Sequence, residues 1–197
     1  MTTEAELKTR KITDVEVGAF NRQVPDEVSD FLGFTKGELV YDGPLRVDAM
    51  PSEDAVVVIG DFVCKGVLEV REDQRLVVTG RLEAKGIIAY GLVLVLGDVS
   101  TGDVLGDSMS NLVFCCGGDA RVRCLIERGH QFEFEGALDA SFVAVLRNVV
   151  RIAGQNVDAL KKGEAEKRLV AEIFDEDGLV KSDLVAQRIW KGQALLR

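Results

Sequence analysis

The chain has 197 residues, of which 47% are apolar, and its 33 acidic and 24 basic side chains give a formal net charge of −9. This length is enough for one substantial hydrophobic core and requires only one domain. The acidic balance argues against nucleic-acid binding, which needs basic side chains to neutralise phosphates, and no apolar run approaches the roughly 18 residues of a membrane span. A basic protein is a better match for such a chain, although net charge also serves solubility alone.

Residues 1–36 are expected to form an amino-terminal cap. Residues 1–11 contain no apolar stretch of the kind that a signal peptide needs, so a cytoplasmic location is expected. A proline and two acidic residues at 25–27 mark the expected start of a short helix, and Gly33 marks its end.

Residues 37–147 repeat one pattern six times: a glycine with apolar residues two and four positions away on both sides. Such alternation places the apolar side chains on one face of extended strands. Only Thr101 is polar among the 24 flanking positions, and successive glycines are separated by 17, 20, 17, 21 and 18 residues. The six glycines are Gly43, Gly60, Gly80, Gly97, Gly118 and Gly136.

This repeat predicts a mainly β fold, a single-stranded parallel β-helix (solenoid) of about six rungs. Strands with one apolar face hide it only by stacking, and glycine suits a corner that needs positive φ or close backbone approach. An antiparallel sandwich is the alternative, because it also has short strands at regular spacing. It lacks support from turn chemistry, since no Asn-Gly or Asp-Gly loop separates consecutive rungs, and Asp42-Gly43 lies inside a rung.

Two polar insertions lengthen the coils, one at residues 71–74 and one at residues 106–110. Polar insertions between strands belong on the surface, where binding residues are concentrated. We therefore expect the acidic residues in and beside these loops to contact a protein partner. They are Glu72, Asp73, Asp103 and Asp107.

Residues 148–197 are expected to form a helical segment packed on the solenoid, because the apolar period changes there to about 3.6. Apolar residues recur at helical spacing between Val157 and Phe174. A last helix is predicted from Ser182, as N-cap, through Trp190, with Trp190 in its apolar stripe and Gly192 ending it.

The sequence predicts no catalytic, cofactor-binding or metal-binding group of residues. His130 is the sole histidine and is interpreted as an ordinary polar residue that opens the sixth rung. Asp61, Asp98 and Asp119 each follow a rung glycine, so they could form an acidic column for Ca²⁺. Hydrogen bonding to nearby backbone is the favoured interpretation, because aspartate readily does this in turns.

The four cysteines include no CxxC pair, which fits a reducing compartment. Cys64 and Cys116 fall at inward positions and are expected to be buried thiols. Cys115 should face outward by the two-residue period, so it is the thiol for which reactivity is worth testing.

The coils VVVIGDFVCKGVLEV, RLVVTGRLEAKGIIAYG and LVLVLGDVSTGDVLGD resemble bacterial proteins with GDLxVxG-type repeats. Over residues 37–147 the repeat style is similar to that of bactofilins, which are polymer-forming cytoskeletal scaffolds with a parallel β-helix. Residues 170–197, with the tail EIFDEDGLVKSDLVAQRIWKGQALLR, resemble a looser group of uncharacterised solenoid proteins, some encoded beside polymorphic toxins. The long helical tail departs from the bactofilin pattern.

The resemblance and the acidity together predict a non-enzymatic, protein-binding function. The expected role is that of an immunity protein, which neutralises a basic bacterial toxin by occluding its active site. A bactofilin-like, self-assembling scaffold is the first alternative, and self-association would then be required. A solenoid acyltransferase is the second, although the strict hexapeptide repeat of such enzymes is missing.

Overall fold

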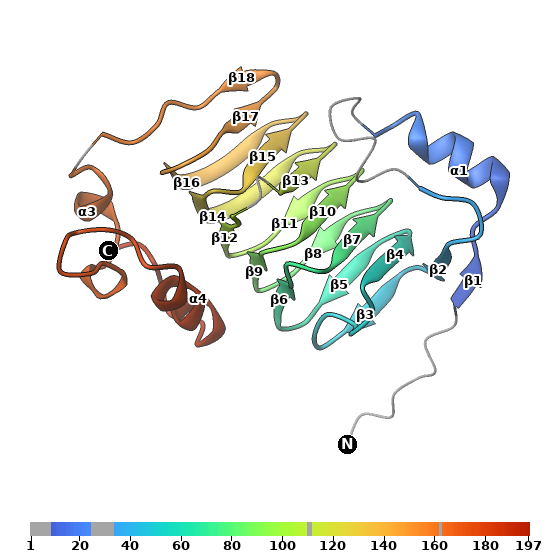
Figure 1. Cartoon of the computed structure of the whole chain (residues 1–197), viewed down its shortest axis with the longest axis horizontal. Coiled ribbons are helices and arrows are strands. Elements are labelled where there is room, and N and C mark those ends of the chain that lie inside the picture. The colour runs from blue at the N-terminus through green and yellow to red at the C-terminus, as the bar shows by residue number, and fades with distance from the viewer. Residues whose placement is uncertain (1–8, 25–33, 110–111, 162) are drawn as a thin grey trace.

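The structure is a computed structural model of the whole chain, and it describes residues 9–24, 34–109, 112–161 and 163–197. The chain forms a parallel β-solenoid of about six turns with few helices (Figure 1). The predicted parallel β-helix is confirmed. The antiparallel sandwich is wrong, because consecutive rungs pair in parallel, for example β4 with β7 and β7 with β10.

Strands stack in three columns along the solenoid, which we call faces 1, 2 and 3. Face 1 contains β2 (Leu39–Asp42), β4 (Ala55–Ile59), β7 (Arg75–Val78), β10 (Leu92–Val95), β13 (Val113–Cys116), β15 (Gln131–Phe134) and β17 (Val150–Ile152). Face 2 contains β3 (Leu45–Val47), β5 (Phe62–Cys64), β8 (Leu82–Glu83), β11 (Val99–Ser100) and the first parts of β14 (Ala120–Arg128) and β16 (Leu138–Val145). Face 3 contains β6 (Val67–Val70), β9 (Gly86–Ala89), β12 (Asp103–Asp107) and the second parts of β14 and β16.

The interior is built from like side chains stacked in register. Val58, Val78 and Val95 lie directly above one another on face 1, and each is fully buried. The apolar alternation therefore identified the inward side chains. Leu39 is the exception, with 58% of its surface exposed, because β2 pairs with β4 only from Tyr41 onward and no coil covers its start.

Glycine and aspartate cooperate at the corner between faces 1 and 2. The carboxylate of Asp98 accepts a hydrogen bond from the backbone N–H of Asp119, one coil further on, at 2.9 Å. A Cβ on Gly118 would lie only 2.3 Å from that same carboxylate oxygen. Asp61 and Asp119 repeat the arrangement, so the backbone-bonding interpretation of these aspartates is confirmed. Close approach, and not positive φ, requires glycine here, and among the rung glycines only Gly60 has positive φ.

Antiparallel strands cover both edges of face 1. At the first edge, β1 (Thr9–Lys11) pairs with β2, and at the last edge β18 (Gln155–Asn156) pairs with β17. The parallel stack thus continues past residue 147 through β17. The helical segment expected from residue 148 is wrong in this first part.

The amino-terminal segment lies over the outer side of face 1. Its helix α1 (Asp14–Asn21) begins with a capping box formed by Thr13 and Glu16. This helix was not predicted, and the helix expected at residues 25–33 lies outside the described residues. Beneath the segment, outward side chains such as Val57 and Leu94 form a buried apolar layer.

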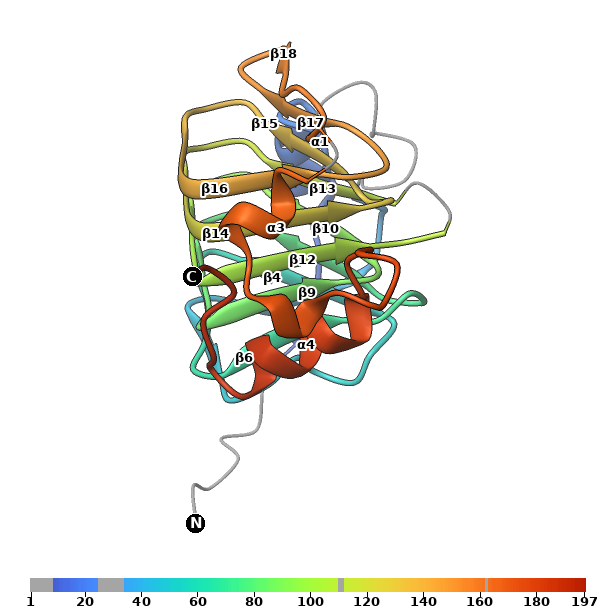
Figure 2. The same cartoon turned by 90° about the vertical axis from the view of Figure 1, so that its left-hand side faces the viewer.

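The carboxy-terminal segment covers the outer side of face 3, so it closes a flank of the solenoid and not an end (Figure 2). It contains α3 (Ala165–Arg168), the 3₁₀ helix η2 (Ala171–Ile173) and α4 (Ser182–Trp190). The predicted bounds of the last helix are confirmed. Ser182 is its first helical residue and not its N-cap, which is Lys181. The helical structure predicted from the spacing of apolar residues over 157–174 is wrong for most of this range, because only the short α3 and η2 form there.

Face 2 stays open to solvent, and its outward column is polar. It runs through Glu83, Ser100, Arg121 and Asp139, which pair in register from coil to coil. Within the described part of the chain, no helix is long and apolar enough to cross a membrane.

Candidate functional site

The four predicted contact residues fall into two groups. Glu72 and Asp73 are exposed in the turn between β6 and β7, as expected. Asp103 and Asp107 are not in a loop, because β12 runs from one to the other. Asp103 is only 2% exposed and holds Arg123 through two bonds of 2.7 and 2.6 Å. It is therefore a structural ion-pair residue, and its assignment to a surface loop is wrong.

Trp190, at the end of α4, is the largest departure from the predicted apolar stripe. Val185 and Ile189 of the same helix are buried against face 3, whereas 51% of the Trp190 surface is exposed. Its indole Nε1 donates a hydrogen bond to Oε2 of Glu69 at 2.9 Å. Glu69 is an outward residue of β6, so the bond ties the ring to the solenoid and fixes its orientation.

Trp190 stands between two hollows. One, of about 250 Å³, is formed mainly by the loop of the first coil and by the start of face 3. The other, of about 330 Å³, also has Trp190 in its lining, together with Lys191 and Gln193 just after α4. We call the first hollow and its tryptophan the Trp190 platform. Its lining residues are Ala49, Met50, Pro51, Val67, Glu69, Arg71, Gln74 and Trp190.

A buried glutamine holds the platform loop in place. Gln74 is 3% exposed, and its Nε2 donates to the carbonyl oxygens of Pro51 at 3.1 Å and Glu53 at 2.9 Å. Its Oε1 accepts from the backbone N–H of Arg71 at 3.0 Å. Gln74 therefore joins the platform loop to the turn that carries Glu72 and Asp73. Residue type alone did not reveal this role, because polar insertions usually face solvent.

Replacing Gln74 with alanine should reduce the free energy of unfolding by about 1–3 kcal/mol, because three backbone groups lose their hydrogen bonds to this buried side chain. Urea unfolding followed by circular dichroism measures the change. Gln193→Ala is the matched control, since Gln193 is exposed and its side chain makes no hydrogen bond in the described structure. Equal stability of the two variants would contradict the bracing role of Gln74.

Charge differs between the two sides of Trp190. On the platform side, Glu69 lines the hollow, and the exposed Glu72 and Asp73 follow Arg71 at its edge. On the other side, Lys85 and Lys191 line the second hollow together with the paired Asp103 and Arg123. Arg71 balances Glu69 in the lining, so it is the adjoining Glu72 and Asp73 that make the platform side favour a basic, partly apolar contact.

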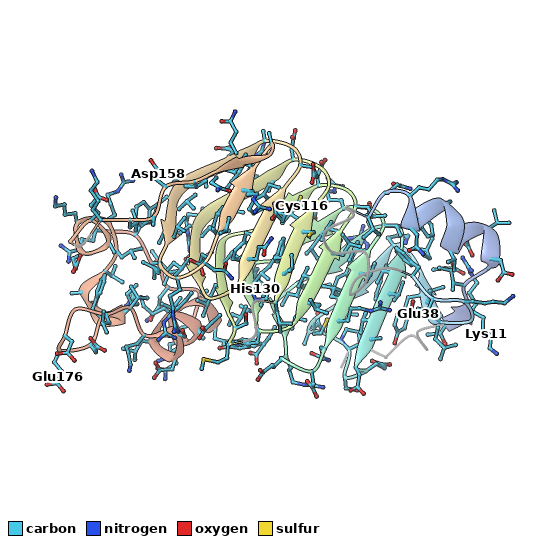
Figure 3. All side chains as sticks on the ribbon, turned by 45° about the horizontal axis from the view of Figure 1, so that its top comes forward. Lys11, Glu38, Cys116, His130, Asp158 and Glu176 are labelled. Carbon is cyan, nitrogen blue, oxygen red and sulfur yellow. The ribbon has the colours of Figure 1, made fainter. Side chains whose placement is uncertain are left out.

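The only histidine lies away from this platform. His130 is fully buried, its ring centroid is 5.6 Å from that of Phe132, and Figure 3 places it among the strands of the solenoid. Burial lowers the pKa of His130 to about 4, so the ring is neutral at pH 7. A substrate on the outside of the molecule does not reach this enclosed ring.

All four cysteines are buried, and none forms a disulfide bond in the described structure. Cys115 does point outward from face 1, but the amino-terminal segment covers it and leaves 2% of its surface exposed. The expectation of an accessible Cys115 is therefore wrong. Burial also raises the pKa of Cys116 and of Cys124 to about 12.

Comparison with known proteins adds no relative from which a site could be transferred. No protein-family model matches the chain, and no curated protein or solved structure is significantly similar to it. Among the residues that the structure describes, no group of three or more histidine, cysteine or acidic side chains is arranged to hold a metal ion.

Proposed function

We propose that the chain is a non-catalytic binding protein that contacts a partner protein through the Trp190 platform. The observation that carries this proposal is Trp190 itself, half-exposed, oriented by Glu69 and flanked by two hollows. Tryptophan is enriched among the few interface residues that supply most binding energy, especially where a ring sits in a well-packed setting. A rigid platform also costs little conformational entropy on binding.

The more specific role that we propose is immunity to a basic bacterial toxin in the cytoplasm. The resemblance of residues 170–197 to solenoid proteins encoded beside toxins supports it, and those residues include Trp190. The formal charge of −9 supports a basic partner. In this role the platform lies across the active-site cleft of the toxin and excludes the substrate.

The acidic turn beside the platform contributes mainly to the rate of association. Glu72 and Asp73 are exposed, so salt screens their attraction to a basic partner at long range, while within about one Debye length the attraction speeds the encounter. Asp107 contributes less, because only 18% of its side chain is exposed and it pairs with Arg128, whereas the side chain of Asp73 is 69% exposed.

Reversing both charges with Glu72→Lys and Asp73→Lys should slow association by about tenfold at low salt, with little change in dissociation. Biolayer interferometry with the partner at two salt concentrations measures this. The control reverses Glu176 and Asp177, which are exposed in the turn before α4 and change the net charge equally. If the control slows association as much, net charge alone acts and the assigned role of the Glu72–Asp73 turn is refuted.

A self-assembling scaffold is the second candidate function. In the described structure β3 pairs only with β5, and β16 pairs only with β14, so both end strands of face 2 have one uncovered edge. The antiparallel strands over both edges of face 1 weigh against end-to-end growth. Sedimentation velocity separates the two functions, since a scaffold forms polymers at high concentration and an immunity protein stays a monomer or dimer.

A further inference from the structure

A third hollow, of about 400 Å³, lies where face 3 turns toward face 1, and it has a different chemistry from the platform. Four of its lining residues come from four consecutive coils and share one register position. Each is either the last residue of a face 3 strand or the residue just after it. These four residues are Arg71, Tyr90, Asp107 and Arg128. Its remaining lining residues are Glu72, Ser108, Met109 and Arg147.

Arginines outnumber carboxylates in this hollow, although the whole chain is strongly acidic. Arg128 is held firmly, because its Nη1 donates to Asp107 at 3.2 Å and to Ser182 Oγ at 2.7 Å. That pair cancels the charge of Asp107. Arg71 is exposed and donates to Asp73 and to the carbonyl oxygen of Ser52, each at 3.3 Å, so it is held less tightly than Arg128.

Arg147 is the most available of the three arginines. Its backbone N–H donates to the buried Glu127 at 2.8 Å, which fixes where the residue leaves β16. Its guanidinium is exposed and has no hydrogen-bond or ion-pair partner among the residues that the structure describes. A guanidinium that is anchored at its backbone and free at its tip is well suited to bind an anion.

We propose that this hollow binds the phosphoryl group of a phosphorylated small molecule. Guanidinium groups from separate coils match a tetrahedral oxyanion, which has several oxygens to accept charge-assisted hydrogen bonds. Half-buried Tyr90 supplies an aromatic wall for the rest of the ligand. A volume of about 400 Å³ lies within the range of roughly 300–1,000 Å³ that is typical of small-molecule sites. Arg71 also lines the platform, so the two sites adjoin, but Trp190 does not line this hollow.

Isothermal titration calorimetry with AMP, adenosine and inorganic phosphate tests this site on the full chain. We expect saturable binding of AMP and weaker binding of phosphate, with none of adenosine. Arg147→Gln should weaken AMP binding about tenfold or more, because a charge-assisted bond is lost from an exposed residue that does not brace the fold. Glu72→Gln should strengthen it several-fold by removing a repulsive charge.

Arg121→Gln is the matched control, since Arg121 is exposed on face 2 and its removal changes the net charge equally. If AMP and phosphate both fail to bind at millimolar concentration, the proposal is overturned. It is also overturned if Arg147→Gln has no effect or if Arg121→Gln weakens binding as much. Trp190→Ala should leave AMP binding unchanged, which separates this site from the partner surface.

Discussion

Replacing Trp190 with alanine should weaken partner binding by about 30-fold or more, the loss expected for a central aromatic anchor worth about 2 kcal/mol or more. The ring is 51% exposed and held by Glu69, so the truncation removes both its apolar contact area and a pre-oriented donor. Calorimetric titration of the purified partner into wild-type and variant chains measures the difference. The loss should fall mainly on the dissociation rate.

Two further variants test whether the lost affinity is specific to the Trp190 platform. Trp190→Phe keeps most of the apolar area but cannot donate to Glu69, so an intermediate loss is expected. Leu179→Ala removes another exposed apolar side chain, one that lies outside the platform and is 63% exposed. Equal losses for Leu179→Ala and Trp190→Ala would show that exposed apolar area in general drives binding, and the platform would lose its assigned role.

Replacing Phe132 with alanine should lower the free energy of unfolding by about 3–5 kcal/mol, the usual cost of truncating a buried phenylalanine. Phe132 is fully buried in β15, with its ring centroid 5.4 Å from Phe114 and 6.1 Å from Phe134. These three rings come from two adjacent coils, so the cavity would loosen the stack itself. Equilibrium urea unfolding measures the change.

Val15→Ala is the control for Phe132, since Val15 is 81% exposed on α1. Its effect should stay within about 0.5 kcal/mol. The stacking of parallel coils requires the aromatic side chains to stabilise the core. A Phe132 variant as stable as this control would contradict that requirement.

The solenoid could be predicted from the sequence because its determinants recur at fixed intervals. Val58, Val78 and Val95 share a register position and an interior location, and each is followed two residues later by a glycine, held there by positive φ at Gly60 and by close contacts at Gly80 and Gly97. Burial of one strand face and close approach at a corner are local consequences of residue type. The pattern around one glycine would be weak evidence, but six repeats of it at similar spacing predict the fold clearly.

The two outer layers could not be predicted in the same way, because alternation identifies only one face of a strand. Val57 and Leu94 point outward yet are buried under the amino-terminal segment, and Leu105 is buried under α4. Apolar residues at outward positions were a signal that something covers these faces. The covering segments themselves are irregular, so periodicity did not locate them.

The candidate site was predicted in part. Glu72 and Asp73 are exposed beside the platform, but the charge of Asp103 is neutralised by Arg123, which lies 20 residues and one coil further on. Aligning the coils by their repeat would have revealed that pair. Trp190 was missed because it adjoins the buried Ile189 at the end of a helix, where small shifts in direction decide exposure.

Trp190 is the only tryptophan of the chain, so its fluorescence reports on the platform alone. Acrylamide quenching, measured on the free chain and on its complex with a basic partner isolated from the native host, tests the binding surface most directly. We predict efficient quenching of the free chain and at least a severalfold smaller quenching constant in the complex. An unchanged constant in a saturated complex would place the partner elsewhere and refute the proposed surface.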